Sequence, residues 1–571
     1  MHWRAVHPWS GRGAVAAEGA TTAAELLLDA LHAHGVEYFF ANAGTDFPPV
    51  IEAFARGAET ARAYPRPMVV PHESVAVGMA HGYYLATGRP QAVMVHVNVG
   101  TANCLNNLIN AARDNVPILL LAGRTPVTER GRKGSRTRPI HWAQEMFDQA
   151  GMLREIVKWD YELRYPEQAA DAVRRAVEIA MTPPRGPVYL VLPREALAGD
   201  VPASIDASPR PVPAAARPDP DAVTRLAQWI AAAEFPLVIA SASGRDPAAV
   251  PALAHLAERF GIGVVCAWPR YVNLPASHPM HLGYAPGDAL RAADLIVALE
   301  SDVPWFPHLE SPRAGARVAH VGIDPTFARY PMRSFPSDLA IAGEPRVVLE
   351  ALAAALDSHT GDGRIEARRK AVATRAAARR LPAHATDPIT PEWISRCIGE
   401  AKGDDTLVIN EYPLRLDHCA FERPGSYFGL SPAGGLGWGL GAALGAKLAA
   451  PRRLVIATLG DGAYVFANPT AGHWAARAYG LPILSVVFNN SRWAAVRNST
   501  VAMYKDGVAA RAGGTLLADL SPSPDYAKLV EAHGGYGERV ERAEALPGAL
   551  ARAIAETRRG RQALLDVVCE Y

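Results

Sequence analysis

Two short polar motifs each end an uninterrupted apolar run, and they constrain the fold more than any other feature of the chain. Gly460-Asp461-Gly462 follows the run Leu454–Leu459, and Asn489-Asn490 follows the run Ile483–Phe488 after an interval of 26 residues. Short, continuously apolar runs separated by a helix-length segment are typical of parallel strands buried on both faces. The carboxyl ends of such strands meet at one sheet edge, where open α/β folds bind ligands. We therefore expect an α/β fold that brings the two motifs together at this edge.

The residue types in these motifs indicate a metal–phosphate site. Carboxylate and amide oxygens, as in Asp461 and Asn490, are hard ligands that suit Mg²⁺ or Ca²⁺, and such an ion usually also binds phosphate oxygens. Gly460 and Gly462 would let the backbone approach a diphosphate closely. A Gly-Asp-Gly triplet alone is usually a turn, so the prediction rests on the spaced asparagine pair and on the two strands.

Apolar strands of this kind recur along the chain in three groups. Two Pro- and Ala-containing stretches, Val201–Pro220 and Asp357–Pro391, are interpreted as linkers that separate segments 20–200, 218–356 and 388–571. Each outer segment contains a helix-like stretch followed by a strand and ends in an amphipathic helix and a strand. A chain of 571 residues is also too long for one core. We predict three doubly wound parallel-sheet domains, of which the outer two are related.

Bulk properties exclude several classes of function. The balance of Lys+Arg 58 against Asp+Glu 57 gives no basic field for nucleic acid or a membrane surface. The 5 cysteines show no CxxC spacing, which argues against a zinc site or a disulfide framework. No apolar run reaches the ~18 residues of a membrane span, and residues 1–19, to which no role is assigned, lack the apolar stretch of a signal peptide. We expect a cytoplasmic protein with no nucleic-acid or membrane partner.

A third motif surrounds Glu73. It follows the strand-like stretch Met68–His72 and precedes a helix-like stretch, Ser74–Thr87, whose apolar residues would partly desolvate its carboxylate. Taken alone, Glu73 would be a surface residue at a helix N-terminus, where negative charge is favourable. Together with the two strand-end motifs, however, the stretch Pro71–Tyr83 resembles the glutamate segment of the thiamine-diphosphate (ThDP) enzymes. The resemblance covers nearly the whole chain after residue 20 and implies ThDP and Mg²⁺ as cofactors.

The same resemblance implies roles for further residues. Glu73 would hold N1′ of the cofactor's aminopyrimidine and move its proton. Leu436 would separate the two cofactor rings, and the main chain of Gly434 would face the amino group. The diphosphate and metal site would consist of Gly460, Asp461, Gly462 and Asn490, with Asp461, Asn490 and Arg492 at the metal. In the family the glutamate and the diphosphate site come from different subunits, so the expected assembly is at least a homodimer, and a homotetramer is preferred.

The glycine run Gly434–Gly441 also permits a different interpretation. Its spacing does not match the G-x-G-x-x-G pattern of a dinucleotide-binding loop. Gly437, Gly441 and Gly445 instead recur every fourth residue, which places them on one helix face. We expect this face to pack closely against another helix.

The stretch Val93–Asn103 indicates the branch of the family. His96 lies 23 residues after Glu73, an arrangement that resembles benzoylformate decarboxylase and differs from acetolactate synthases, which have small residues there. Thr45 lies where the decarboxylase has a substrate-binding serine, and His308 is a looser match to its second active-site histidine. A lone strand histidine is usually a core residue, but a neutral His96 with a pKa near ~6.5 would suit proton transfer.

Other segments depart from the decarboxylase pattern. The interval between the two strand-end motifs is longer, and Ser491-Arg492-Trp493 differs. The arginine-rich stretch Arg124–Arg138 and the following His141–Glu145 are more similar to the synthases. These arginines could steer an anionic substrate, although a solvated loop is the simpler explanation.

We predict a homo-oligomeric ThDP- and Mg²⁺-dependent enzyme that decarboxylates a 2-oxo acid and yields an aldehyde or an acyloin. An acetolactate-synthase-like carboligase is the alternative enzyme, and a ThDP-binding sensor without turnover is a more remote one. FAD in the central domain is possible, but no flavin motif supports it. The substrate's side chain is not evident from the sequence.

Overall fold

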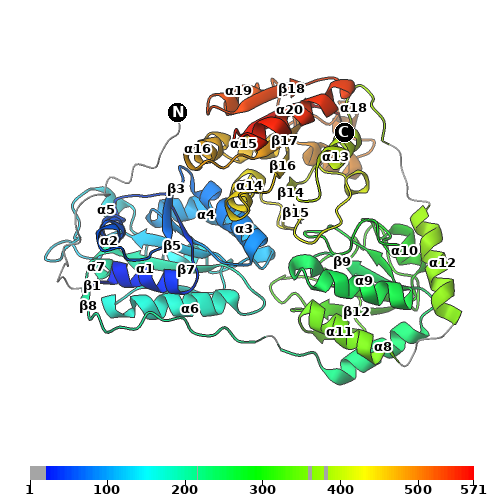
Figure 1. Ribbon diagram of the computed structural model, residues 1–571, viewed down its shortest axis with the longest axis horizontal. Coiled ribbons are helices and arrows are strands. Elements are labelled where there is room, and N and C mark those ends of the chain that lie inside the picture. Colours follow the sequence, from blue (N-terminus) through cyan, green and yellow to red (C-terminus); the bar gives the residue numbers. More distant parts are fainter. Residues whose placement is uncertain (1–20, 215, 358–362, 378–382, 571) are drawn as a thin grey trace. The chain divides into compact units, whose positions relative to one another are not determined.

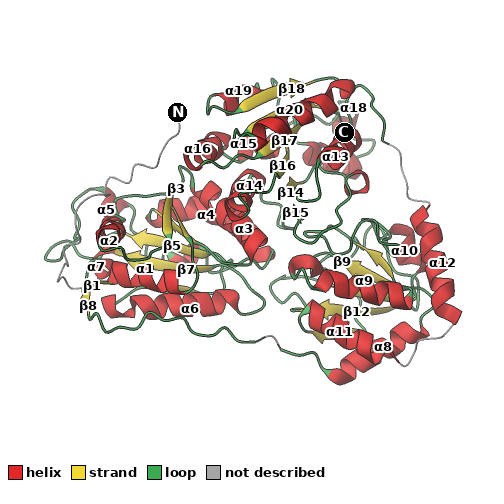
Figure 2. Cartoon of the chain, in the orientation of Figure 1, coloured by secondary structure: helices red, strands yellow, loops and turns green. Residues whose placement is uncertain are grey.

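The computed structural model describes residues 21–214, 216–357, 363–377 and 383–570, so the segment 1–19 lies outside the described residues. These residues form three α/β domains, each built on a parallel sheet, with helices beside the strands (Figure 2). The predicted fold class is confirmed. By its internal contacts the chain divides into two compact units, Met1–Pro213 with Ser431–Ala449, and Ala214–Leu430 with Ala450–Tyr571. No helix in the described part of the chain is long and apolar enough to cross a membrane.

The N-terminal domain contains a six-stranded sheet with strand order β3-β2-β4-β5-β7-β6, parallel throughout. Its strands β3, β5 and β7 are labelled in Figure 1. The strands are β2 (Tyr38–Ala41), β3 (Arg66–Val69), β4 (Ala92–Val95), β5 (Leu119–Arg124), β6 (Asp160–Glu162) and β7 (Val188–Pro193). One face shares a core with α1 (Ala23–Ala33), α2 (Pro48–Glu59) and α6 (Ala169–Met181). The strands also contact α3 (Glu73–Thr87) and α4 (Val97–Arg113). Shorter elements are α5 (Ile140–Ala143), α7 (Arg194–Leu197), and β1 (Thr21–Thr22), which pairs antiparallel with β8 (Asp200–Val201).

The C-terminal domain repeats this topology. Its sheet has the order β15-β14-β16-β17-β19-β18, and both outer sheets therefore read 2-1-3-4-6-5 when strands are counted from the first of the main sheet. The predicted relation between the outer domains is confirmed. The strands are β14 (Leu407–Glu411), β15 (Tyr427–Gly429), β16 (Val455–Gly460), β17 (Leu484–Asn489), β18 (Tyr536–Val540) and β19 (Ala563–Val568). The helices are α13 (Pro391–Ala401), α15 (Asp461–Phe466), α16 (Pro469–Tyr479), α17 (Ala494–Met503), α18 (Val508–Arg511), α19 (Tyr526–Glu531) and α20 (Leu546–Arg558).

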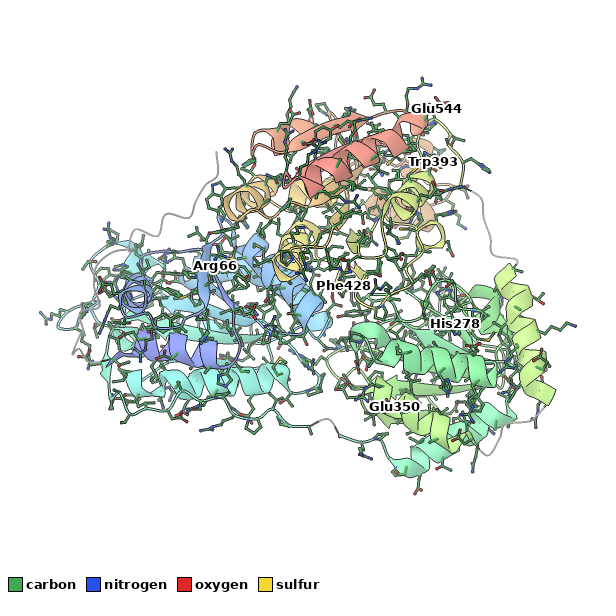
Figure 3. All side chains as sticks on the ribbon, viewed as in Figure 1. Arg66, His278, Glu350, Trp393, Phe428 and Glu544 are labelled. Carbon is green, nitrogen blue, oxygen red and sulfur yellow. The ribbon has the colours of Figure 1, made fainter. Side chains whose placement is uncertain are left out.

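The central domain has a five-stranded parallel sheet of order β10-β9-β11-β12-β13. Its strands are β9 (Pro236–Ala240), β10 (Gly263–Val265), β11 (Leu295–Leu299), β12 (Arg317–Gly322) and β13 (Leu339–Ala342). The helices α8 (Pro220–Ala232), α9 (Ala249–Phe260), α10 (Gly287–Ala292) and α11 (Pro345–Ala355) share its core. Within the second unit, Phe428 of β15 (labelled in Figure 3) meets Tyr271 edge-to-face at a ring-centroid distance of 5.8 Å, which joins the central and C-terminal domains.

One predicted linker is wrong in part. The stretch Asp357–Pro391 contains the helix α12 (Gly363–Ala377), which packs on the central domain. Val372 is fully buried in the central core, and the guanidinium of Arg368 donates to the carbonyl oxygens of Ile230 and Ala231 at 3.0 and 2.9 Å. The polar composition is misleading because this arginine caps the carbonyl end of α8, where main-chain acceptors lack helical partners.

The glycine-rich helix packs as expected against another helix. The helix α14 (Trp438–Ala449) lies in the first unit, against α3. A Cβ atom at Gly441 would lie 3.0 Å from the carbonyl oxygen of Val75, and one at Gly82 or Gly445 would overlap the facing backbone. Gly437 does not belong to this face, because it precedes the helix with a φ of 84°.

Candidate active site

His96 and Asp46 form an ion pair at the carboxyl end of the N-terminal sheet. The strand β4 ends at Val95, so His96 lies one residue beyond the strand on which it was predicted and directly precedes α4. Its Nδ1 lies 2.6 Å from one carboxylate oxygen of Asp46, and the Val97 N–H donates to the other oxygen at 3.2 Å. Asp46 follows β2. The pair therefore lies where the strand order reverses between β2 and β4, which is the usual ligand position in such sheets.

Small residues and local strain make this pair possible. A Cβ atom at Gly44 would overlap the imidazole of His96, and one at Gly123 would overlap the carboxylate of Asp46. Val97 has a φ of 37°, which is a strained conformation for a β-branched residue. Such strain is typical of functional sites because the surrounding structure must hold it in place.

The charge of Asp46 raises the pKa of His96. The main cause is the hydrogen bond to the Asp46 carboxylate, which outweighs the opposite effect of burial, and Gln144 and Glu73 act in the same direction as Asp46. The raised pKa means that a larger fraction of His96 carries a second ring proton than of an ordinary histidine at the same pH. A protonated His96 is suited to donating a proton.

Glu73 lies in the same domain as this pair. It is the first residue of α3, is 8% exposed, and accepts a hydrogen bond from Asn103 Nδ2 at 3.1 Å. A Cβ atom at Gly100 would lie 3.2 Å from the other oxygen of Glu73, so the first turn of α4 passes close to the carboxylate. The predicted partial desolvation of Glu73 is therefore observed.

The other two predicted catalytic residues differ in their placement. Thr45 precedes Asp46, and its carbonyl oxygen accepts from Arg194 Nη1 at 3.0 Å. Thr45 and His96 line one pocket, whose residues are Thr45, Asp46, His96, Val97, Arg124, Thr125, Pro126, His141, Gln144 and Arg194. His308 is an exposed residue of the second unit, in the loop after β11, and is not part of this pocket.

The segment that carries Leu436 is fixed by asparagines of α4. Asn106 Nδ2 donates to the carbonyl oxygen of Leu436 at 2.7 Å. Asn110 forms a reciprocal pair with the main chain of Gly435, donating at 2.7 Å and accepting at 3.0 Å. Gly434 has a φ of 67°, which favours glycine. Neither asparagine was predicted as a site residue from the sequence. Two amide side chains four residues apart inside a helix are nevertheless a signal, since asparagine is a poor helix former.

Asp461 and Asn490 lie at the carboxyl ends of neighbouring strands. β16 pairs in parallel with β17, with Gly460 opposite Phe488, so the two motifs share one sheet edge as expected. Asp461 is the first residue of α15 and is 2% exposed, and within the described residues its Oδ2 has no hydrogen-bond partner. Burial raises the pKa of Asp461 to about 6, against the opposing effect of nearby main-chain N–H groups.

The two asparagines of the pair have different environments. Asn489 is buried, donates to Asp566 at 2.8 Å and accepts from the Ser491 N–H at 3.2 Å. Among the described residues, Asn490 Oδ1 accepts one hydrogen bond, from the Arg492 N–H of its own turn at 3.1 Å. Asn489 therefore stabilises the turn, and Asn490 is the better candidate ligand.

Three models of one enzyme family match the chain. The thiamine pyrophosphate enzyme N-terminal TPP binding domain matches residues 21–152, the central domain residues 223–352, and the C-terminal TPP binding domain residues 414–567. The chain belongs to the thiamine pyrophosphate enzyme family.

The chain is similar to family members that are named for different reactions. Benzoylformate decarboxylase of Pseudomonas aeruginosa is 28% identical over 92% of this chain and 96% of its own length. Acetolactate synthase of Mycobacterium bovis is 27% identical over 92% of this chain and 84% of its own length. The structure of a thiamine diphosphate-dependent 4-hydroxybenzoylformate decarboxylase from Rhodococcus jostii superposes with a TM-score of 0.79 and 23% identity, covering 96% of this chain and 99% of that one.

The residues of this thiamine pyrophosphate enzyme fit a divalent cation bound with a diphosphate. The buried, unpartnered oxygen of Asp461 is an acceptor that a cation would satisfy. Among the described residues, no group of three or more His, Cys, Asp or Glu side chains could hold a metal, so the remaining ligands would be neutral or phosphate oxygens. The Arg492 side chain only donates hydrogen bonds, and its main-chain carbonyl is therefore the group that could reach the metal.

Proposed function

We propose that this chain is a ThDP- and Mg²⁺-dependent decarboxylase of a 2-oxo acid, with carboligase capacity and of the benzoylformate-decarboxylase type. The observation that carries the proposal is the His96–Asp46 pair, which places a histidine of raised pKa in the domain that also holds Glu73. Bound ThDP supplies the electron sink that loss of CO₂ from a 2-oxo acid needs, and no amino-acid side chain can replace it.

Each candidate residue has a distinct task in this proposal. Glu73 holds and moves a proton at N1′ of the aminopyrimidine, while Asn103 fixes its carboxylate. Leu436 and the main chain of Gly434 bind the cofactor's ring region. The diphosphate and metal are held by Gly460, Asp461, Gly462, Asn490 and the carbonyl of Arg492.

His96 acts on the substrate. Nδ1–H of His96 donates a hydrogen bond to the Asp46 carboxylate, which leaves Nε2 as the nitrogen that can donate to substrate. Because Asp46 stabilises the imidazolium, His96 is more readily protonated than an ordinary histidine, and this proton can be delivered at the reacting carbon. Protonation of the reacting carbon favours release of an aldehyde, whereas bond formation between this carbon and a second carbonyl compound would give an acyloin.

An acetolactate-synthase-like carboligase is the second candidate, supported by the similarity to an acetolactate synthase over most of the chain. His96 favours the decarboxylase, because the synthases resemble this chain less at that position. A role for Thr45 and His308 at the substrate is retained as part of the proposal, as is a homodimer or homotetramer. The five buried, free cysteines suit the cytoplasm that we propose as its location.

The test is CO₂ release from a panel of 2-oxo acids, with ThDP and Mg²⁺ present, and identification of the product as aldehyde or acyloin. We expect aldehyde from the best substrate and no CO₂ from the Asp461→Ala variant. Acyloin as the main product would favour the carboligase. Saturable ThDP binding without turnover of any acid would identify a sensor instead.

A further inference from the structure

His141 presents an unused hydrogen-bond donor beside the candidate active site. It lies in the one-turn helix α5 and is 3% exposed. Its Nδ1 accepts from the Thr137 N–H at 3.0 Å, so the neutral ring carries its proton on Nε2. This Nε2 is buried and has no hydrogen-bond partner within the part of the chain that the structure describes.

Arg124 presents a second such donor. It lies at the carboxyl end of β5, and its Nη1 donates to Glu162 at 2.8 Å. Its Nε–H is buried and, among the described residues, has no acceptor. Arg124 and His141 both line the pocket that contains His96 and Thr45.

Unsatisfied buried donors need an explanation, because each one destabilises a folded protein. Water does not provide it here, since the side chains close on one another so that no water molecule fits between them. The donors would therefore be satisfied by an acceptor group that enters with a ligand and widens the pocket. Two donors that line one pocket suit one acceptor group with two lone pairs, such as a carboxylate.

The charges around the pocket favour an anion. Burial lowers the pKa of His141. Nearby positive charges lower it further, namely those of Arg194, Arg138, Arg136 and His96. His141 therefore stays a neutral donor, whereas His96 is held toward its cationic form. The lining cations Arg124 and Arg194 exceed the lining acid Asp46, which is already paired with His96. Arg124 is itself paired with Glu162 and Glu145, which lie 2.8 and 3.8 Å from its terminal guanidinium nitrogens, so these contacts leave its Nε–H free of an acceptor among the described residues.

We infer that His141 Nε2–H and Arg124 Nε–H form an anion-binding subsite that holds an acidic oxygen of the substrate next to His96. The identity of the ligand as a 2-oxo acid rests on the proposed function. Eight of the ten lining residues are polar, so the subsite suits a carboxylate better than an aryl ring. That carboxylate is either the one common to all 2-oxo acids or a second acid group on the side chain.

Equilibrium binding of unreactive acids to the ThDP–Mg²⁺ holoprotein tests the subsite without turnover. Glutarate and hexanoate lack the 2-oxo group, and they differ in the second carboxylate. His141→Asn keeps an acceptor for the Thr137 N–H but removes the Nε2 donor, whereas His141→Gln can place an N–H near the Nε2 position. We expect His141→Asn to raise the calorimetric Kd about tenfold or more, and His141→Gln to raise it much less.

Two further variants make the result specific. Arg124→Lys keeps the positive charge but removes Nε–H, so it should also weaken binding, and it serves if His141→Asn does not fold. Arg130→Gln removes an exposed charge of the same loop and should leave binding almost unchanged. Weaker binding of both acids identifies the carboxylate common to 2-oxo acids, and weaker binding of glutarate alone identifies a second acid group.

The two proposals can fail separately. A subsite confirmed by these Kd changes, in a protein that releases no CO₂ from any 2-oxo acid, would leave the inference standing and remove the proposed function. Wild-type affinity in folded His141→Asn and Arg124→Lys, or no binding of either acid to wild type, would overturn the inference.

Discussion

The buried carboxylate of Asp461 has an uncompensated charge when no cation is bound. Because its pKa is raised to about 6, the folded protein binds this proton more tightly than the unfolded chain, whose Asp titrates near ~3.9. The stability from this group is thus present below that unfolded value and is lost as pH rises through about 6.

Asp461→Asn should therefore stabilise the cofactor-free protein at pH 7 to 8, by at most ~3 kcal/mol, and have little effect near pH 4. The same variant should lose most of its Mg²⁺-dependent ThDP affinity, because the amide carries no charge for the cation. Thermal unfolding across pH and calorimetric ThDP titration measure the two effects. Undiminished ThDP affinity would show that Asp461 is not at the metal.

The pairing of His96 with Asp46 predicts a pH effect. Asp46→Asn removes the hydrogen-bonded charge that raises the pKa of His96, so this pKa should fall. If protonated His96 is the active form, the decline of activity at high pH should begin at a lower pH in this variant. NMR titration of the histidine ring and the pH dependence of kcat measure this shift.

His96→Ala is the companion variant. It should lower kcat about 10²-fold or more and leave ThDP affinity nearly unchanged, since the imidazole would act on the substrate rather than on cofactor binding. A normal specific activity combined with a lower Tm would instead identify His96 as a structural residue.

At the scale of secondary-structure elements, α3 packs closely against α14. The helices α3 and α14 meet through glycines, and a Cβ atom at Gly82 would overlap the backbone at Ala442. Gly82→Ala should therefore force the helices apart and destabilise the protein by about 1–3 kcal/mol. Gly403→Ala is the control, because its Cβ would meet no described atom within 4 Å. Equal unfolding free energies of the two variants would show that the close approach is not needed.

This packing also connects stability with the site. α3 begins with Glu73, and the segment just before α14 carries Leu436. A shift of either helix would move a residue that we propose to bind the cofactor. We therefore expect Gly82→Ala to weaken ThDP affinity as well, which Gly403→Ala should not do.

At the scale of the whole molecule, the candidate residues lie in two compact units. Glu73, His96 and Leu436 are in one, and Asp461 and Asn490 are in the other. The family resemblance implies that a complete site takes Glu73 from one subunit and Asp461 from another. A mixed dimer of two inactive variants can then contain one intact site.

Coexpression of Glu73→Gln with Asp461→Ala tests this arrangement. Each variant alone should be inactive, and random dimers should recover about a quarter of wild-type activity, because half of the dimers are mixed and each holds one intact site of two. Sites built within single chains would give no recovery. Sedimentation velocity of the mixture confirms that the variants associate.

Local sequence patterns determined the fold class, the relation between the outer domains and the sheet edge that brings Asp461 and Asn490 together. The strands β16 and β17 coincide with the predicted apolar runs Leu454–Leu459 and Ile483–Phe488 to within one residue at each end. These features are predictable because a strand buried on both faces must be apolar along its whole length, and a parallel sheet must bring the strand ends together.

Only the tertiary structure revealed the partner of His96, the orphan donor of His141 and the packing of α12. Asp46 and His96 are 50 residues apart, and their loops carry no shared pattern that indicates contact. Arg368 looks solvated in sequence, yet it is buried against carbonyl groups of another helix. A polar side chain acquires its role from the groups that the fold places around it, since hydrogen bonding and burial decide its charge and pKa, and neither is encoded in its neighbours along the chain.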